Sequence, residues 1–333
     1  MGDAIPLLFL VIILSIIFDF INGFHDTANA IATVISTRVL SPFWAIIMAA
    51  SLNFLGAISG TEVAKTIGSG IIGTNVPQHA VIAALSGAII WNLVTWHKGL
   101  PSSSSHALIG GLVGSGIAYS GTNQVHWDVL FQKVIIPLFG SPVVGFFAGF
   151  ILMKFIFNFF FWVRPGIINS FFRRAQIISS AFMAFSHGSN DAQKTMGIIT
   201  LALIASGTIP AQPFHIPLWV IIISALAMAL GTAGGGWRII HTMGTKLVNL
   251  TPVYGFGAET AAATIIETAS RFGLPLSTTH VISSTILGVG ASKRLNAVRW
   301  NVARQIFKAW GMTIFVSAGI AFLVYKATTI FFP

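Results

Sequence analysis

Two segments of the chain repeat one another, and each places an aspartate in an apolar region. The first covers residues 22–29 (NGFHDTAN) and the second covers residues 187–194 (HGSNDAQK). The alignment that pairs their glycines also pairs Asp26 with Asp191, at an offset of 191 − 26 = 165 residues in a chain of 333. An acid among apolar helices is costly and usually marks an ion or proton pathway. One such acid in each half suggests a site where two repeats meet.

A second repeated element follows each aspartate segment. Residues 100–106 (LPSSSSH) match residues 274–280 (LPLSTTH), at an offset of 275 − 101 = 174. The same two elements in the same order predict two transmembrane repeats, residues 1–163 and 176–333. A basic cytoplasmic linker, residues 164–175, is expected to join them. The sequence leaves open whether the repeats are parallel or inverted.

The proline-hydroxyl elements have the composition of a helix start that binds an anion. Proline suits the first helical turn, and serine or threonine hydroxyls cap the free backbone N–H groups there. Those N–H groups and the positive end of the helix dipole attract an anion, to which the hydroxyls add neutral donors. The predicted anion ligands are Ser103, Ser104, Ser105, Ser277, Thr278 and Thr279. The alternative is that these hydroxyls are ordinary helix caps or packing contacts.

The two aspartates require a different ligand, a cation or a proton that travels with the anion. Gly23 and Gly188 are expected to break their helices and expose carbonyl oxygens beside the acids. The predicted coupling-ion residues are Asp26, Asp191, Asn22 and Glu259, with Asp26 and Asp191 as metal ligands if the ion is Na⁺. The alternative is an aspartate that pairs with Lys194 or Arg38 only for stability.

The repeated elements also contain histidines and a lysine, which can carry protons or charge. Each of the four repeated elements contains one histidine: His25, His106, His187 and His280. Such a side chain can carry a proton near neutral pH, or act as a fixed hydrogen-bond partner. The second role is favoured for His106 and His280, which directly follow the hydroxyls. Lys194 lies three residues after Asp191 and is expected to neutralise it or to touch the anion.

Long apolar runs must position these groups. Hydrophobic residues make up 55% of the chain and charged residues 8%, far below the roughly 25% of charged residues in soluble proteins. The composition predicts an all-α, polytopic membrane protein of roughly 10–12 transmembrane or re-entrant helices. Residues 107–119 and 281–291 are too short to span a bilayer and predict half-helices or re-entrant hairpins. Residues 68–76 and 237–250 are either short membrane helices or interfacial segments.

The charges predict the orientation of the chain. The formal net charge of +10 comes from short basic segments around residues 164–174 and 293–304, which is typical of cytoplasmic loops rather than of nucleic-acid binding. The N-terminus, and less clearly the C-terminus, are expected outside. The first apolar run has no basic leader and continues into Asp19, so it predicts a spanning helix rather than a signal peptide. There is no cysteine, which excludes disulfides and thiolate metal sites.

These elements resemble the inorganic phosphate transporter (PiT) family, in its short bacterial form. The resemblance rests on residues 23–30 with Thr37 and Arg38 behind them, and on residues 101–106, 187–197 and 273–280. Glu259 matches a glutamate that the family carries ahead of the second hydroxyl element. The resemblance covers both halves of the chain, but the long cytoplasmic loop of larger relatives is missing.

The resemblance implies symport of inorganic phosphate across the cell membrane, coupled to Na⁺ or H⁺, with an inverted repeat and a homodimer in the lipid bilayer. It adds Asn29 and Asn190 to the phosphate site, beside Asp26 and Asp191. Apart from the coupling ion, it implies no cofactor. Sulfate, a neutral metal–phosphate complex and an anion channel are the alternatives. An enzyme is not expected, because no His-Glu-x-x-His or Gly-x-Ser-x-Gly template occurs.

Overall fold

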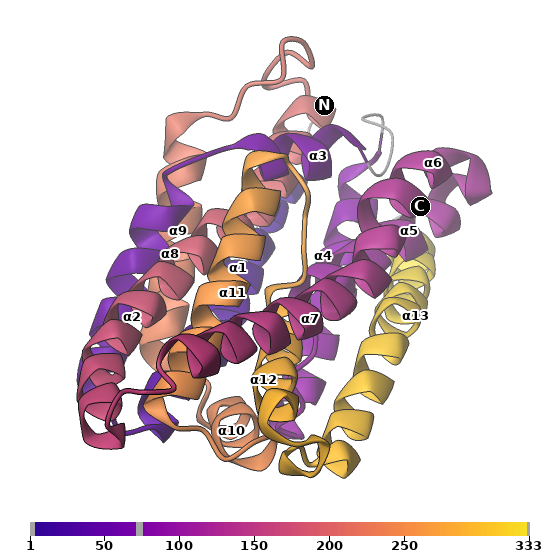
Figure 1. Cartoon of the computed structure of the whole chain (residues 1–333). Helices are drawn as coiled ribbons and strands as arrows, with labels where there is room; N and C mark the ends of the chain where they lie inside the picture. The colour runs from indigo at the N-terminus through magenta and orange to yellow at the C-terminus, as the bar shows by residue number, and fades with distance from the viewer. Residues whose placement is uncertain (1–3, 71–75, 332–333) are drawn as a thin grey trace.

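The computed structural model describes residues 4–70 and 76–331, and this part of the chain is almost entirely helical (Figure 1). The helices of the first half are α1 (Ala4–Ser36), α2 (Pro42–Ala57), α3 (Glu62–Gly70), α4 (Gln78–His97), α5 (Ser104–Ser120), α6 (Trp127–Leu130) and α7 (Ile136–Phe159). Those of the second half are α8 (Pro165–Ala205), α9 (Leu218–Gly234), α10 (Trp237–His241), α11 (Pro252–Arg271), α12 (Thr278–Lys293) and α13 (Trp300–Phe331). The predicted all-α fold is confirmed.

Several of these helices are long and apolar enough to cross a membrane. Four meet that description by length and composition: Ile5–Ser36, Gln78–His97, Trp127–Phe159 and Trp300–Ile330. Two bent pairs, α2 with α3 at 70° and α9 with residues 237–246 at 61°, raise the number to six if each pair is one span. Helices α5 and α12, of 17 and 16 residues, are the short helices predicted from residues 107–119 and 281–291.

The outer faces of the long helices match a lipid environment. Helix α7, which crosses the front of the bundle obliquely in Figure 1, exposes Phe139, Phe147, Ile151 and Phe155 on one side. Exposed apolar surface of this extent marks contact with lipid or with another protein. The prediction of a polytopic membrane protein is therefore confirmed.

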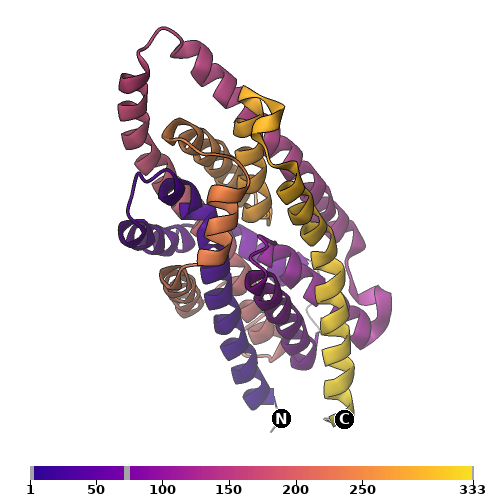
Figure 2. The same ribbon diagram turned by 90° about the horizontal axis from the view of Figure 1, so that it is seen from below.

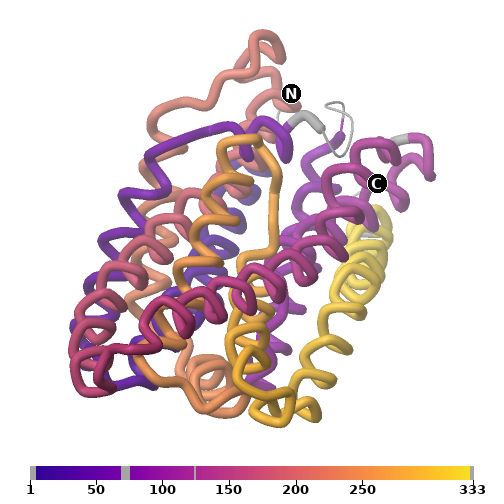
Figure 3. Tube along the Cα trace, viewed as in Figure 1, coloured from indigo at the N-terminus to yellow at the C-terminus, as the bar shows by residue number. Residues whose placement is uncertain are grey.

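Both ends of the described chain lie at one end of the bundle, as the ribbon and the tube show (Figures 1, 2 and 3). The α7–α8 turn, α10 and the α12–α13 connection lie at the opposite end (Figure 1). These segments carry the basic residues Arg164, Arg238 and Arg294. This shared location agrees with the expected cytoplasmic side, and the assignment of the side itself stays a prediction.

The aspartate helices are not broken where the sequence predicted. Helix α1 passes through Gly23, and α8 passes through Gly188, without interruption. The glycines serve close helix packing instead: a Cβ at Gly23 would lie 2.3 Å from the Met228 carbonyl oxygen, and one at Gly188 would lie 2.1 Å from that of Asn53. The breaks lie at the hydroxyl elements, where extended segments precede α5 and α12.

The structure also describes the predicted linker, one of the two ambiguous segments and part of the other. Most of the linker at residues 164–175 is the first part of α8 rather than a loop, so the two halves are joined through a helix. Residues 237–250 contain α10 and a single π-helical turn, residues 242–246. Of the ambiguous segment at residues 68–76, residues 71–75 lie outside the described part of the chain. The repeat itself and its orientation stay predictions.

The close helix packing leads to a test of stability. Replacing Gly188 by alanine should destabilise the protein by about 1–3 kcal/mol, because the new methyl group meets backbone that cannot rotate away. Gly311→Ala is the matched control, since a Cβ at Gly311 meets no atom within 4 Å and alanine favours the helix by up to about 1 kcal/mol. Melting temperatures in detergent should fall for the first variant only.

Candidate functional site

The two hydroxyl elements form helix starts of the predicted kind. Ser103 precedes α5, and its Oγ accepts a hydrogen bond from the His106 backbone N–H at 3.1 Å. Ser277 precedes α12 and accepts in the same way from His280 N–H at 3.2 Å. Each cap satisfies one of the free N–H groups of a helix start and leaves others for a ligand.

The two helix starts meet inside the protein. The rings of His106 and His280 lie 4.9 Å apart between their centroids, and the Ser105 hydroxyl donates to the Leu276 carbonyl oxygen at 3.3 Å. All these residues except Leu276 are at most 2% exposed. Two positive helix ends from the two halves of the chain therefore face a common region.

Asp26 joins the first helix start to α1. Its Oδ2 accepts from the Ser104 hydroxyl at 2.8 Å, and its Oδ1 lies 2.6 Å from His25 Nδ1 and 3.4 Å from the Thr279 hydroxyl. Ser104 also contacts Asn22 Oδ1, one turn earlier on α1. The partners of this carboxylate are hydroxyls and an imidazole, and the described residues place no lysine or arginine against it.

Asp191 joins the second helix start to α8 in the equivalent way. Its Oδ2 accepts from the Thr278 hydroxyl at 2.9 Å and lies 3.2 Å from His187 Nε2. Its Oδ1 pairs with Lys194 Nζ, one turn further along α8. The pairing of Asp191 with Lys194 that the sequence suggested is therefore present.

Asn29 and Lys194 occupy corresponding positions after the two aspartates, and each donates a hydrogen bond to the helix start in the other half of the chain. Asn29, three residues after Asp26, donates to the hydroxyl of Thr279 at 2.9 Å and to that of Thr278 at 3.2 Å. Lys194, three residues after Asp191, donates to the Ser105 hydroxyl and, at 3.1 Å, to the Leu276 carbonyl oxygen. The first half thus presents a neutral amide where the second half presents a buried ammonium.

The two aspartates converge on one candidate cation site. One ligand atom each from Asp26, His187 and Asp191 lie within 4.8 Å of one another, and all three residues are buried. Two carboxylates can hold Na⁺ or another hard cation, while the imidazole can add a ligand or a proton. This convergence agrees with the pairing expected from the sequence repeat.

Comparison with known proteins identifies the family of the chain. The chain matches the phosphate transporter family over residues 22–168 and 163–321. It is 47% identical over 327 residues to a "probable low-affinity inorganic phosphate transporter" of Rhizobium meliloti, with 97% of each chain covered. A protein of the same description from Bacillus subtilis is 46% identical, with 98% of each chain covered. The chain belongs to the phosphate transporter family.

The fold agrees with that assignment. A solved structure described as "The sodium-dependent phosphate transporter" superposes with a TM-score of 0.89 at 26% identity, covering 98% of this chain and 99% of that one. Together with its apolar helices, the family makes this transporter a multi-pass protein of the cell membrane and not an enzyme.

Glu259 of the transporter lies in a separate polar cluster. Its carboxylate accepts from the hydroxyls of Thr33 and Ser179, and Gln176 Nε2 lies 3.4 Å from its Oε1. Thr33 stands on α1 seven residues after Asp26, which corresponds to about 10 Å along the helix. Glu259 is fully buried among neutral donors rather than in contact with the two aspartates.

Asn190 also has contacts of its own. Its amide nitrogen donates to the Ser270 hydroxyl at 2.9 Å and to the Leu274 carbonyl oxygen at 3.3 Å. These bonds tie α8 to the end of α11 and to the extended segment before α12. Asn190 thus positions the second helix start, and its Oδ1, which has no hydrogen-bond partner, is the atom left for a ligand.

Sequence reasoning missed a continuous polar stripe on α1. Its members recur at alternating intervals of four and three residues and are all buried: Ser15, Asp19, Asn22, Asp26, Asn29 and Thr33. That spacing keeps them on one face of a helix, so the periodicity alone was sufficient to find Asp19 and Thr33. His187 completes the cation site and belongs to the same repeated segment as Asp191.

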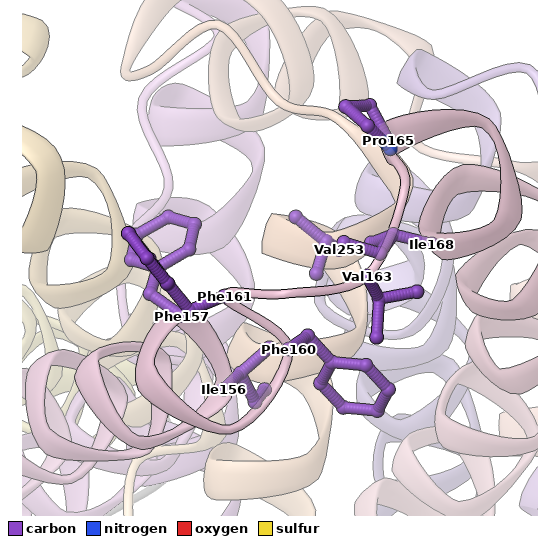
Figure 4. Close-up of a pocket in the computed structure, with 8 residues that line it drawn as sticks. All are labelled: Ile156, Phe157, Phe160, Phe161, Val163, Pro165, Ile168 and Val253. Atoms are coloured by element: carbon purple, nitrogen blue, oxygen red, sulfur yellow. The ribbon is translucent and has the colours of Figure 1, made fainter.

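An apolar hollow near the α7–α8 turn lies apart from this site. Its lining comes from α7, the turn and the starts of α8 and α11: Ile156, Phe157, Phe160, Phe161, Val163, Pro165, Ile168 and Val253 (Figure 4). It offers no charged or hydroxyl side chain. An apolar lining of this kind suits a lipid chain rather than an oxyanion.

Proposed function

We propose that this transporter is a symporter that moves inorganic phosphate across the cell membrane together with H⁺ or Na⁺. The observation that carries the proposal is the direct bond between each helix start and an acid, Ser104 to Asp26 and Thr278 to Asp191. The groups suited to an anion and those suited to a cation are thereby parts of one hydrogen-bonded unit. The phosphate relatives and the sodium-dependent solved structure support this combination.

The geometry supplies a physical mechanism for coupling. A hydroxyl has a single O–H to donate. Thr278 directs its O–H at Asp191, and Ser104 shares its O–H between Asp26 and Asn22 Oδ1. A cation or proton that binds Asp26 or Asp191 neutralises the acid and frees that hydroxyl to donate to phosphate. Each ligand then favours the other, which is the positive, reciprocal coupling that symport requires.

Phosphate would be held from both helix starts. The donors would be the hydroxyls of residues 103–105 and 277–279 with the free N–H groups of α5 and α12. Asn29 and Asn190 keep only Oδ1 without a partner, so they would accept a hydrogen bond from a protonated phosphate oxygen. Lys194 adds one positive charge next to Ser105. A hydroxyl cage binds the anion without the tight bidentate grip of an arginine cluster, so release stays fast.

Access to this site requires movement of the helices. The acids and hydroxyls are at most 2% exposed, so ions reach them only when the two halves open towards one side. A homodimer in the bilayer, as the resemblance implies, would leave each protomer with its own site.

The proposal is tested by uptake into liposomes that contain the purified protein. Labelled phosphate should accumulate against its gradient when a Na⁺ or H⁺ gradient is imposed, with Na⁺ replaced by choline in one arm and pH varied in the other. Sulfate and a divalent-metal phosphate complex serve as competing substrates. Uptake that never exceeds equilibrium would indicate a channel, and the absence of any gradient-driven oxyanion uptake contradicts the proposal.

A further inference from the structure

Asp19 is a buried acid outside the repeated elements. It stands on α1 seven residues before Asp26, and its repeat position, 19 + 165 = 184, is Ala184. Its side chain is fully buried, and neither carboxylate oxygen has a hydrogen-bond partner. Burial disfavours the charged form of a carboxylate that lacks hydrogen bonds, so a bound proton or cation is the stable state of such a group.

The polar atoms around Asp19 are also without partners. Along the same stripe these are the hydroxyl of Ser15, four residues earlier, and Nδ2 of Asn22, three residues later. From α8 the Thr195 side chain faces Asp19, and its Oγ1 likewise has no hydrogen-bond partner. Buried orphan atoms on two packed helices that converge on one acid indicate a site that receives a ligand.

The charges near Asp19 favour a proton over a metal ion. Asp191 and Lys194, both on α8, act on it electrostatically. Helix α9, which also packs on α1, carries no acid, base or histidine, and α4 carries only His79 and His97 near its ends. The unpartnered atom that Asn22 contributes is Nδ2, an N–H donor that cannot bind a metal cation, which leaves few oxygen ligands for a metal ion around Asp19. A proton needs one carboxylate oxygen.

Asp19 also continues a line of acids through the protein. Asp19, Asp26 and Thr33 follow one another at intervals of seven residues, about 10 Å each, and Thr33 donates to Glu259. Helix α1 runs from the end of the bundle that holds the chain termini towards the opposite end, so Asp19 precedes Asp26 and Thr33 in that direction (Figure 1). Three carboxyl groups thus lie along one face of α1.

We propose that Asp19 is a proton-binding site of this transporter, loaded from the side of the chain termini before the Asp26 site. The inference rests on the proposed symport and names its coupling ion and its first acceptor. The step forms one O–H bond on the Asp19 carboxylate with a proton from solution, and the same proton leaves on the other side.

The test separates exchange from accumulation in proteoliposomes. Phosphate–phosphate exchange requires no net proton movement, so Asp19→Asn should keep it within about twofold of the wild type. Accumulation driven by a pH gradient should fall at least tenfold, and the proton uptake that phosphate entry causes, followed with a trapped pH dye, should disappear. Asp128→Asn, at an exposed acid of α6, is the matched control and should change neither readout.

The outcomes are distinct. Asp19→Asn protein that accumulates phosphate like the wild type overturns the inference, as does equal loss of exchange and accumulation in folded protein. Accumulation driven by Na⁺ alone in the wild type overturns the choice of the proton. If Asp19→Asn does not fold, Asp19→Glu must retain gradient-driven uptake with an altered pH profile, and an unaltered profile contradicts the role. Absence of phosphate exchange in the wild type would instead refute the proposed function.

Discussion

Replacing Asp26 by asparagine is expected to abolish gradient-driven phosphate uptake while leaving the protein folded. The amide keeps the shape of the carboxylate and still accepts from Ser104, so the helix contact survives. It can no longer bind a proton or compensate the charge of a cation, so the hydroxyl is never released to the anion. Uptake in proteoliposomes should fall to the level of empty liposomes, with unchanged elution of the protein in size-exclusion chromatography.

Asp191→Asn should abolish the same uptake, because both acids contribute to one cation site. Glu62→Gln is the control, since Glu62 is an exposed acid that pairs with Lys65 at 2.7 Å on the surface. Full gradient-driven uptake by both Asp26→Asn and Asp191→Asn would show that these acids do not bind the driving ion. Loss of gradient-driven uptake in only one of the two variants would show that the driving ion binds only the aspartate changed in that variant.

The convergence of the two aspartates could be predicted from the sequence, because repeated segments in the two halves of a transporter commonly meet at one site. Asp26 and Asp191 lie 165 residues apart and meet, and Ser103 and Ser277 cap their helices as their motifs require. Proline and hydroxyl residues act locally, so their effect on the backbone can be derived without tertiary contacts. The same holds for the long apolar runs that form α1, α7 and α13.

The sequence alone could not predict which neighbouring side chains or helices each of these residues contacts. Gly23 and Gly188 suit both a helix break and a close helix contact, and only the proximity of α9 and α2 selects the second. Asn190 lies beside an acid in sequence, yet its amide binds Ser270 and Leu274, since side chains on a helix point to different neighbours. Glu259 accepts hydrogen bonds from Thr33 on α1 and Ser179 on α8, both distant in the sequence.

Lys194 makes the two halves of the site unequal, with a direct consequence for stability. Its ammonium is 1% exposed and has three acceptors, the carboxylate of Asp191, the hydroxyl of Ser105 and the carbonyl of Leu276. Removal of one partner of a buried ion pair costs about 3–5 kcal/mol, because the other charge stays uncompensated. Lys194→Gln and Asp191→Asn should each therefore lower the melting temperature strongly, whereas Asp26→Asn should not.

The double variant Lys194→Gln/Asp191→Asn distinguishes the ion pair from the transport role. It leaves no unpaired charge, so its destabilisation should be smaller than the sum of the two single variants by about 1–3 kcal/mol, measured as a double-mutant cycle of unfolding free energies in detergent. Uptake should nevertheless stay absent, because the second acid of the cation site is gone. Additive stabilities would show that Lys194 and Asp191 do not interact, while recovered uptake would reduce Asp191 to a counter-ion of Lys194.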